Sequence, residues 1–195
     1  MSSGAGSVRC GRCALRPPCA CRFLEPLPVR TRFVVLRHAR EAQKSSNSAR
    51  WAALLVPRCE MRTWAGRRDA AALRDLGRPG DWLLFPSGRD EPGPADPVPS
   101  PARVLVLDGT WRQVRRILRA LPALQTLPRL SLPAGAPRLR LRAAPAPGCL
   151  STLEAMAGAV ALLESEALGR VLDARHRAVV ALALAARGWR LPEAA

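Results

Sequence analysis

The stretch of residues 103–121, RVLVLDGTWRQVRRILRAL, sets the strongest limits on how this chain can fold. Residues 104–107 are apolar and β-branched at alternate positions, which predicts a strand buried on both faces. Gly109 permits a tight turn, and Asp108 or Thr110 can cap the helix that follows. In open α/β sheets, ligands bind at the carboxyl ends of strands, near turns of this kind. The stretch therefore predicts a ligand site beside Asp108.

The helix predicted after this turn has two different faces. Four arginines share one face because they recur three or four residues apart, and they are Arg112, Arg115, Arg116 and Arg119. The opposite face would pack on a sheet through Val114, Ile117, Leu118 and Leu121. A row of arginines is often only a solvated face. Guanidinium groups also pair with phosphate oxygens, so this face is a candidate RNA-binding surface.

The charge of the chain points to an anionic partner. Its 195 residues include 31 Lys and Arg against 15 Asp and Glu, a formal net charge of +16, and Lys44 is the one lysine. A strongly basic domain attracts polyanions over long distances, so nucleic acid is the first partner to consider. The length suits one domain with a small appendage. We expect an N-terminal appendage of residues 1–28 and a main domain of residues 29–195.

No segment has the character of a secretory signal or a membrane span. Residues 1–8 lack an apolar core, and the longest apolar run, residues 178–186, is too short to cross a bilayer. We therefore expect a cytosolic protein with no membrane partner. Reducing compartments disfavour structural disulfides, which bears on the six cysteines.

Four of the cysteines form a cluster near the N-terminus. Their pattern is C-x2-C-x5-C-x-C, and they are Cys10, Cys13, Cys19 and Cys21. Four thiolates so close together suit a tetrahedral zinc ion, and four protein ligands leave no open position for catalysis. The spacing thus predicts a structural zinc site, with four unliganded thiols as the alternative. Cys59 and Cys149 stand alone and are expected to be ordinary buried residues.

Strand-like and helix-like segments alternate along the rest of the chain. Strands are predicted at residues 31–37, 82–85, 129–132 and 138–142, and residues 62–76 combine a short strand with a helix. Further helices are predicted at residues 49–56, 151–168 and 172–187. This alternation predicts an α/β domain with a largely parallel sheet.

Several polar positions have both a structural and a functional interpretation. His38 opens a polar loop, where it is a general base or a partner of the backbone; a structural or RNA-facing role is favoured. Asn47 or Ser48 can cap the helix after this loop. Ser151 and Glu154 form a predicted capping box, which explains both residues without a further function. Arginines on one face of the strand at residues 138–142 would add a second cationic row, and they are Arg138, Arg140 and Arg142.

Three motifs in order give the chain a family resemblance. They are the cysteine cluster, the tetrad D-x-T-W at residues 108–111, and Leu-Ser-Thr-Leu-Glu-Ala at residues 150–155. With them the chain resembles the DTW-domain family, the tRNA-uridine aminocarboxypropyltransferases. The loop after the first strand keeps His38, Glu41, Ser46 and Asn47 of the family pattern, with Ala39 where proline is usual.

The resemblance implies a fold and a cofactor. DTW proteins look related to the SPOUT class, in which the C-terminal half is tied in a trefoil knot around S-adenosylmethionine. The cofactor loops would then be residues 85–88, 108–111 and 148–152. The cofactor-binding residues carried over in this way are Phe85, Pro86, Leu107, Gly109, Thr110, Leu150, Ser151 and Thr152.

The reaction implied by the resemblance moves the 3-amino-3-carboxypropyl group of S-adenosylmethionine to N3 of a tRNA uridine and leaves methylthioadenosine. Asp108 is the acid best placed to accept the N3 proton, although helix capping would also explain it. Thr110 would bind the cofactor or orient Asp108. Trp111 would stack on a base or on adenine, or else lie in the core. His38 and Asn47 would join the arginine face in contacting tRNA.

Two other classes of protein remain as alternatives. A methyltransferase of similar fold would release S-adenosylhomocysteine in place of methylthioadenosine. A zinc-containing RNA-binding protein without catalytic activity would bind tRNA unaltered. In each case we expect a monomer with no obligate protein partner.

Overall fold

A parallel sheet forms the centre of the protein. The computed structural model describes residues 8–86, 100–134, 139–144 and 146–189. Within these residues five strands pair in the order β2-β1-β4-β3-β5, and every pairing is parallel. The strands are β1 (Phe33–His38), β2 (Cys59–Trp64), β3 (Asp81–Leu84), β4 (Arg103–Asp108) and β5 (Arg129–Leu130). The predicted α/β class and largely parallel sheet are confirmed.

Strand β4 lies in the middle of the sheet, between β1 and β3. Val104 and Val106 belong to the larger of two hydrophobic clusters, whereas Leu105 belongs to the smaller one. Alternate side chains of β4 therefore enter cores on opposite faces, which explains the continuous apolar run in its sequence. The register sets Asp108 beside Arg37 at the carboxyl ends of β4 and β1.

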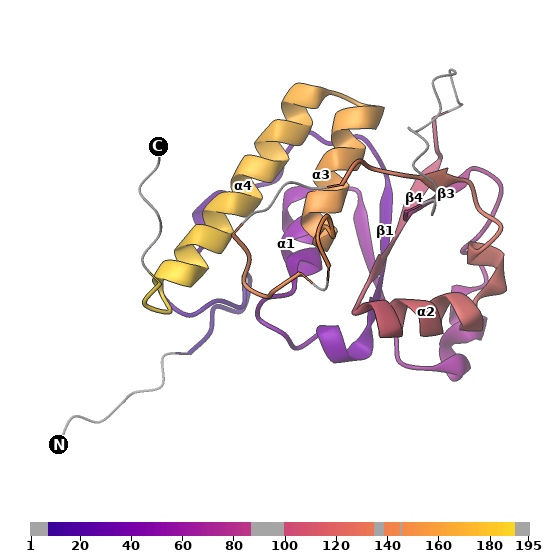
Figure 1. Ribbon diagram of the computed structural model, residues 1–195, viewed down its shortest axis with the longest axis horizontal. Coiled ribbons are helices and arrows are strands. Elements are labelled where there is room, and N and C mark those ends of the chain that lie inside the picture. Colours follow the sequence, from indigo (N-terminus) through magenta and orange to yellow (C-terminus); the bar gives the residue numbers. More distant parts are fainter. Residues whose placement is uncertain (1–7, 87–99, 135–138, 145, 190–195) are drawn as a thin grey trace.

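The helices divide unequally between the two faces of the sheet (Figure 1). On the face of the larger cluster lie α1 (Ser48–Leu55), α3 (Thr152–Leu163) and α4 (Glu166–Ala185), and on the other face lies α2 (Trp111–Ala120). The short 3-10 helices are η1 (Cys21–Phe23), η2 (Ala39–Glu41), η3 (Arg67–Leu73) and η4 (Pro122–Leu124). None of the helices in the described ranges is both long and apolar enough to cross a membrane.

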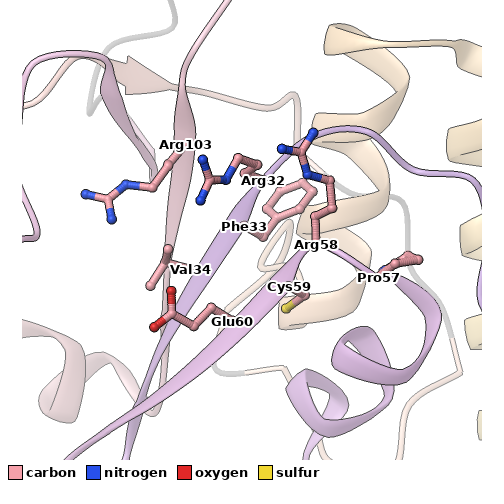
Figure 2. A pocket seen from close by; sticks show the side chains of 8 residues that line it. All are labelled: Arg32, Phe33, Val34, Pro57, Arg58, Cys59, Glu60 and Arg103. Carbon is pink, nitrogen blue, oxygen red and sulfur yellow. The ribbon is translucent and has the colours of Figure 1, made fainter.

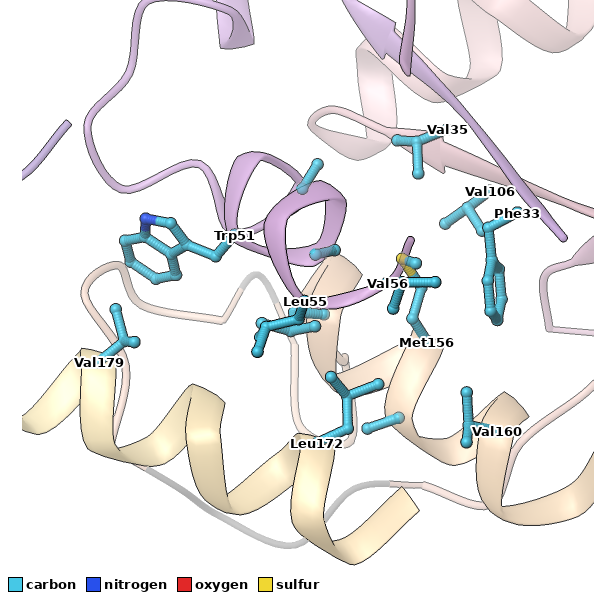
Figure 3. Packing of buried hydrophobic residues seen from close by; sticks show 14 of the residues in the cluster. Phe33, Val35, Trp51, Leu55, Val56, Val106, Met156, Val160, Leu172 and Val179 are labelled. Atoms are coloured by element: carbon cyan, nitrogen blue, oxygen red, sulfur yellow. The ribbon is translucent and has the colours of Figure 1, made fainter. Parts of the chain in front are cut away.

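The larger cluster joins segments that are far apart in the sequence (Figure 3). It includes Phe33 of β1, Leu55 of α1 and Met156 of α3. Cys13 and Leu24 of the cysteine-bearing segment lie in the same cluster. Burying one large apolar side chain contributes about 1.5–3 kcal/mol. The cysteine-bearing segment is therefore held against β1, α1 and α3 by apolar packing.

The last two helices have different limits from those predicted. Helix α3 ends at Leu163 and α4 begins at Glu166, whereas the sequence pattern continues the first to residue 168. Ser165 Oγ accepts a hydrogen bond from Leu168 N at 3.4 Å and so caps α4. The neighbouring Glu164 accepts hydrogen bonds from the backbone of Arg30 and Thr31 at 2.9 and 2.6 Å. A local cap and a long-range contact carry no helical periodicity, so the pattern does not reveal this break.

The strand predicted at residues 138–142 is wrong. Residues 139–142 form no strand, and Arg138 lies outside the described residues. Arg140 Nη2 lies 2.9 Å from Glu154 Oε2, and Arg142 Nη1 lies 2.9 Å from Glu41 Oε2. Both guanidinium groups are committed to buried carboxylates, so the expected second cationic row is wrong as well.

Candidate functional site

Strand β4 ends at Asp108, a residue that is only 4% exposed. Asn47 Nδ2 donates to Asp108 Oδ2 at 2.6 Å, and Thr152 Oγ1 donates to Oδ1 at 2.6 Å. Asn47 is the N-cap of α1, and Thr152 is the first residue of α3. The carboxylate therefore joins the end of β4 to the starts of two helices, where a negative charge is favourable. We call Asn47, Asp108 and Thr152 the carboxylate clasp.

The surroundings of Asp108 change its acidity. Burial raises the pKa of this carboxyl above the ordinary value for aspartate. The hydrogen bonds from Thr152 and Asn47 lower the pKa without cancelling the effect of burial. A carboxylate with a raised pKa takes up a proton more readily, as a general base must. Each of its oxygens has two lone pairs, so both can accept a further hydrogen bond within the clasp.

The turn after β4 is capped by Thr110, not by Asp108. Thr110 Oγ1 accepts from Gln113 N at 3.3 Å, and Gln113 Oε1 accepts from Thr110 N at 2.6 Å. This capping box begins α2. A Cβ at Gly109 would lie 3.0 Å from Gln113 Oε1, so the close approach of that side chain favours glycine. Capping thus explains Thr110 and leaves Asp108 without that role.

Two aromatic rings lie where β3 and β4 leave the sheet. The ring centroids of Phe85 and Trp111 are 5.5 Å apart in an edge-to-face arrangement. The guanidinium of Arg129, a residue that the sequence did not single out, lies 5.1 Å from the Phe85 centroid. Trp111 is 37% exposed, so the structure excludes a core position for it. An exposed indole supported by a second ring can stack on a nucleobase or on adenine.

The three loops expected to bind a cofactor meet at this edge of the sheet. The hydrogen bond between Asp108 and Thr152 joins residues 108–111 to residues 148–152. The ring contact joins the first of these loops to Phe85. Pro86 is exposed beside it, and Ser87 and Gly88 lie outside the described residues.

The loop before α3 also contains the predicted capping box, which is confirmed. Ser151 N donates to Glu154 Oε2 at 2.6 Å, and Glu154 N donates to Ser151 Oγ at 3.4 Å. Leu150 is half-buried in this loop, as is Leu107 near the end of β4. Helix capping accounts for the Ser151 hydroxyl, whereas Thr152 turns its hydroxyl to the clasp.

Glu41 is a second carboxylate near the clasp and has no exposed surface. Lys44 and Arg142 both bind it, the latter with Nη1 at 2.9 Å from Oε2. Burial raises the pKa of Glu41, but the hydrogen bonds from Lys44 and Arg142 outweigh burial and leave it lowered. Glu41 therefore stays ionised at neutral pH. Its partner Arg142 is too far along the chain for sequence spacing to reveal.

His38 serves the local backbone. It is 6% exposed, and its Nδ1 accepts from Arg40 N at 3.2 Å, which caps η2. Burial and the nearby charges of Arg116 and Arg40 lower its pKa, so the imidazole is neutral at neutral pH. Its ring centroid lies 5.4 Å from that of Trp64. These contacts give His38 a structural role, one of the two roles that its sequence context favours.

Helix α2 presents an arginine face beside the site. Its four arginines are all exposed, namely Arg112, Arg115, Arg116 and Arg119. Val114 and Ile117 are buried on the opposite side of the helix, as its periodicity predicts. Because α2 begins three residues after Asp108, the arginine face starts at the same edge of the sheet as the clasp.

The four N-terminal cysteines come together in space. The Sγ atoms of Cys10, Cys13, Cys19 and Cys21 all lie within 4.8 Å of one another. Cys10 Sγ lies 3.6 Å from Cys21 Sγ, and Cys13 Sγ lies 3.8 Å from Cys19 Sγ. Four sulfurs held by tetrahedral zinc at 2.3 Å are about 3.8 Å apart. The cluster therefore fits one metal ion.

The cysteine cluster is tied to the helix that begins at the clasp. Trp51 of α1 is buried, and its Nε1 donates to the carbonyl oxygen of Cys13 at 3.0 Å. The other two cysteines, Cys59 and Cys149, are half-buried, which is less than expected, and Cys59 packs against the larger cluster. Neither belongs to the metal-binding group found among the described residues.

An open hollow lies at the opposite edge of the sheet (Figure 2). It has a volume of about 410 Å³, at the amino ends of β1, β2 and β4. Arg32, Arg58, Glu60 and Arg103 are among the residues that line it. Arg103 is held by Asp81, with Nε 2.7 Å from Oδ1. The hollow is therefore separate from the clasp, which lies at the other end of β4.

Known proteins resemble this chain over most of its length. It is 33% identical over 169 residues to tRNA-uridine aminocarboxypropyltransferase 2 of Drosophila melanogaster, covering 80% of this chain and 67% of that protein. The proteins of that name from Macaca fascicularis and Mus musculus are 27% identical over 168 residues, and 56% of each is covered. No solved structure matches the chain. The DTW domain matches residues 7–184, and the chain belongs to the DTW-domain family.

Proposed function

We propose that this chain is a tRNA-uridine aminocarboxypropyltransferase that uses S-adenosylmethionine as its donor. The names of its relatives support both tRNA and the transferred group. The observation that carries the proposal is the buried Asp108 carboxylate with its raised pKa. It lies where the three loops meet, beside the exposed Trp111 and the arginine face of α2.

The proposed reaction exchanges one bond for another. A bond forms between uridine N3 and the γ-carbon of the donor's methionine part, and the bond from that carbon to the sulfonium sulfur breaks. The sulfur keeps the electron pair of the broken bond and loses its positive charge. The rest of the donor therefore leaves as neutral methylthioadenosine. N3 loses its proton, which Asp108 accepts. Three carbons surround the sulfonium, so the protein must direct the γ-carbon, and not the methyl group, toward N3.

The roles of the site residues follow from their positions. The donor would lie against the three loops, whose proposed contacts are Phe85, Pro86, Leu107, Gly109, Thr110, Leu150, Ser151 and Thr152. Thr110 caps α2 and so fixes the turn that carries Asp108. Trp111 offers an exposed ring to the uridine or to adenine. The uridine must leave its stack before N3 can reach the carboxylate.

RNA contact is proposed for the arginine face of α2. Exposed guanidinium groups can bind the tRNA phosphates while the target base enters the site. His38 and Asn47 are 6% and 1% exposed, so we assign them positioning roles in place of direct contact with RNA. His38 fixes the start of η2, and Asn47 holds Asp108.

The remaining features of the proposal concern the whole chain. Cys10, Cys13, Cys19 and Cys21 would hold one structural zinc ion, since their sulfurs lie at suitable separations. The SPOUT-like knot and the division at residues 28 and 29 stay predictions. So do a cytosolic location and a monomeric state without an obligate protein partner.

Nucleoside analysis tests the proposed function. Full-length protein is incubated with unmodified tRNA and S-adenosylmethionine, and the tRNA is digested to nucleosides for mass spectrometry. We expect a uridine that carries the aminocarboxypropyl group, with an equal amount of methylthioadenosine. A methylated nucleoside with S-adenosylhomocysteine would instead support a methyltransferase. Bound but unaltered tRNA, with no cofactor product, would support a non-catalytic RNA-binding protein.

A further inference from the structure

Two arginines flank the carboxylate clasp without being paired to it. Arg37 is the register partner of Asp108 on β1 and points to the same face of the sheet. Its Nη2 donates to Thr63 Oγ1 at 3.4 Å. Arg50, in the first turns of α1, donates from Nη2 to the carbonyl oxygen of Ala42 at 2.9 Å.

Each of these guanidinium groups has one buried nitrogen without an acceptor among the described residues. The Nε atoms of Arg37 and Arg50 are buried and have no hydrogen-bond partner among the described residues. None of the ion pairs among the described residues includes Arg37 or Arg50. A buried donor without an acceptor is costly, and native structures usually explain such a donor by a bound ion or water. Both residues are only half-buried, so a ligand can reach the outer guanidinium nitrogens.

Charge in this region is also unbalanced. Its cations include Arg37, Lys44, Arg50 and Arg142, and the carboxylates among them are Glu41 and Asp108. Glu41 is taken by Lys44 and Arg142. Asp108 receives its hydrogen bonds from two neutral side chains of the clasp. Arg37 lies close enough to Asp108 and to Arg50 to feel both charges, and neither arginine is bonded to that carboxylate. A second anion would balance the two arginines.

We propose that Arg37 and Arg50 bind the carboxylate of the aminocarboxypropyl group during transfer. This inference rests on the proposed function, because it needs S-adenosylmethionine as the donor. A guanidinium offers two parallel N–H groups, which match the two oxygens of a carboxylate. Anchoring the carboxylate next to Asp108 would hold the γ-carbon toward N3 and leave the methyl group turned away.

A phosphate of the target nucleotide is also an oxyanion that Arg37 and Arg50 could bind. The test must therefore separate binding of the donor's carboxylate from binding of a tRNA phosphate. Methylthioadenosine serves this purpose, because it keeps the adenosine and the sulfur of the donor but has no carboxylate. Isothermal titration of the full chain measures the binding of S-adenosylmethionine, methylthioadenosine and tRNA separately. The variants are Arg37→Gln and Arg50→Gln. The control is Arg32→Gln, an exposed arginine just before β1, at the end far from Asp108.

We expect the unchanged chain to bind S-adenosylmethionine more tightly than methylthioadenosine. Each Gln variant should lose about tenfold or more of its affinity for S-adenosylmethionine, as expected for a lost hydrogen bond to a charged group. Its affinity for methylthioadenosine and for tRNA should stay the same, and the control should lose nothing. Arg37→Lys keeps the positive charge but not the paired N–H groups of the guanidinium, so it should lose part of the affinity for S-adenosylmethionine. This variant replaces Arg37→Gln in the test if Arg37→Gln does not fold.

Other results would overturn the inference. An equal loss for both small ligands would indicate general damage to the site. A loss confined to tRNA would assign the pair to a nucleotide phosphate. Unchanged affinities in both variants would leave the proposed function standing and remove this inference alone. If the unchanged chain binds no S-adenosylmethionine, the donor in the proposed function fails, and the inference fails with it.

Discussion

Residue 108 has to make the hydrogen bonds of the carboxylate clasp and also accept a proton in the proposed reaction. The clasp needs an oxygen that faces Asn47 and a partner for the hydroxyl of Thr152. Asparagine can supply both, because its amide oxygen accepts and the Thr152 hydroxyl can turn to accept from its NH₂ group. The reaction, in contrast, needs the negative charge. One substitution therefore separates the two demands.

Asp108→Asn should lower the rate of transfer about 10²–10⁴-fold, the usual contribution of a general base. The melting temperature should change little, since the shape of the residue and the contacts of the clasp are kept. Single-turnover transfer at saturating tRNA and donor gives the rate, and thermal unfolding gives the control. A near-normal rate would reduce Asp108 to a structural residue. It would also leave the reaction without an evident base in this region, because Glu41 and His38 are already engaged by other groups.

Glu41→Gln should lower the free energy of unfolding by about 2 kcal/mol at neutral pH, because buried hydrogen bonds from two cations are weakened. The folded-state pKa of Glu41 is lowered, so its contribution is present above the ordinary pKa of glutamate and is lost as pH falls through the lowered value. Urea unfolding at several pH values should therefore show a difference from the unchanged chain that shrinks below about pH 4.

Glu60→Gln is the matched control for this measurement. Glu60 pairs with Arg62, but its side chain is 54% exposed, and exposed pairs contribute only about 0–1 kcal/mol. An equal loss of stability in both variants, or a difference that persists in acid, would contradict the account of Glu41 as a buried ionised anchor.

At the scale of elements, the arginine face of α2 should control RNA affinity. Replacing Arg112, Arg115, Arg116 and Arg119 with Gln should weaken tRNA binding and reduce its salt dependence by about one unit of slope per lost phosphate contact. Binding of S-adenosylmethionine should hardly change, because these side chains point to solvent. Filter binding across a salt series measures both quantities.

A control with the same change in net charge separates this face from general attraction. Four arginines within and just after α4 suit it, of which Arg170, Arg177 and Arg187 are exposed and Arg175 is half-buried. Their replacement should have a much smaller effect, since α4 lies on the other face of the sheet from α2 (Figure 1). Equal effects of the two quadruple changes would mean that α2 is only a solvated helix.

Sequence reasoning succeeded for elements whose information is local. The strand, turn and helix around Gly109 follow from periodicity and capping, and so does the box formed by Ser151 and Glu154. It failed where a distant partner decides the structure. Arg142 looked like part of a cationic row because the sequence gives no sign that Glu41 lies next to it. The sequence likewise gives no sign that the Nε atom of Arg37 is buried without a hydrogen-bond partner among the described residues.

At the scale of the whole molecule, we expect about one zinc ion per chain by elemental analysis. Removing the zinc with a chelator should lower the melting temperature, because the cysteine-bearing segment is part of the packed core. Cys13 and Leu24 lie in the larger cluster, and the carbonyl oxygen of Cys13 accepts a hydrogen bond from Trp51. A Cys19→Ser variant should behave like the chelated protein, and Cys149→Ser, outside the cluster, should not. A metal-free chain with full stability and activity would contradict a structural zinc site.

The clasp also orders events during synthesis of the protein. Its hydrogen bonds join Asp108 to residues 61 positions earlier and 44 positions later. On the ribosome, Asp108 and the basic helix α2 are synthesised before Thr152. The carboxylate of such a nascent chain still lacks one of the two groups that hold it. The site is therefore completed only when α3 folds onto the sheet.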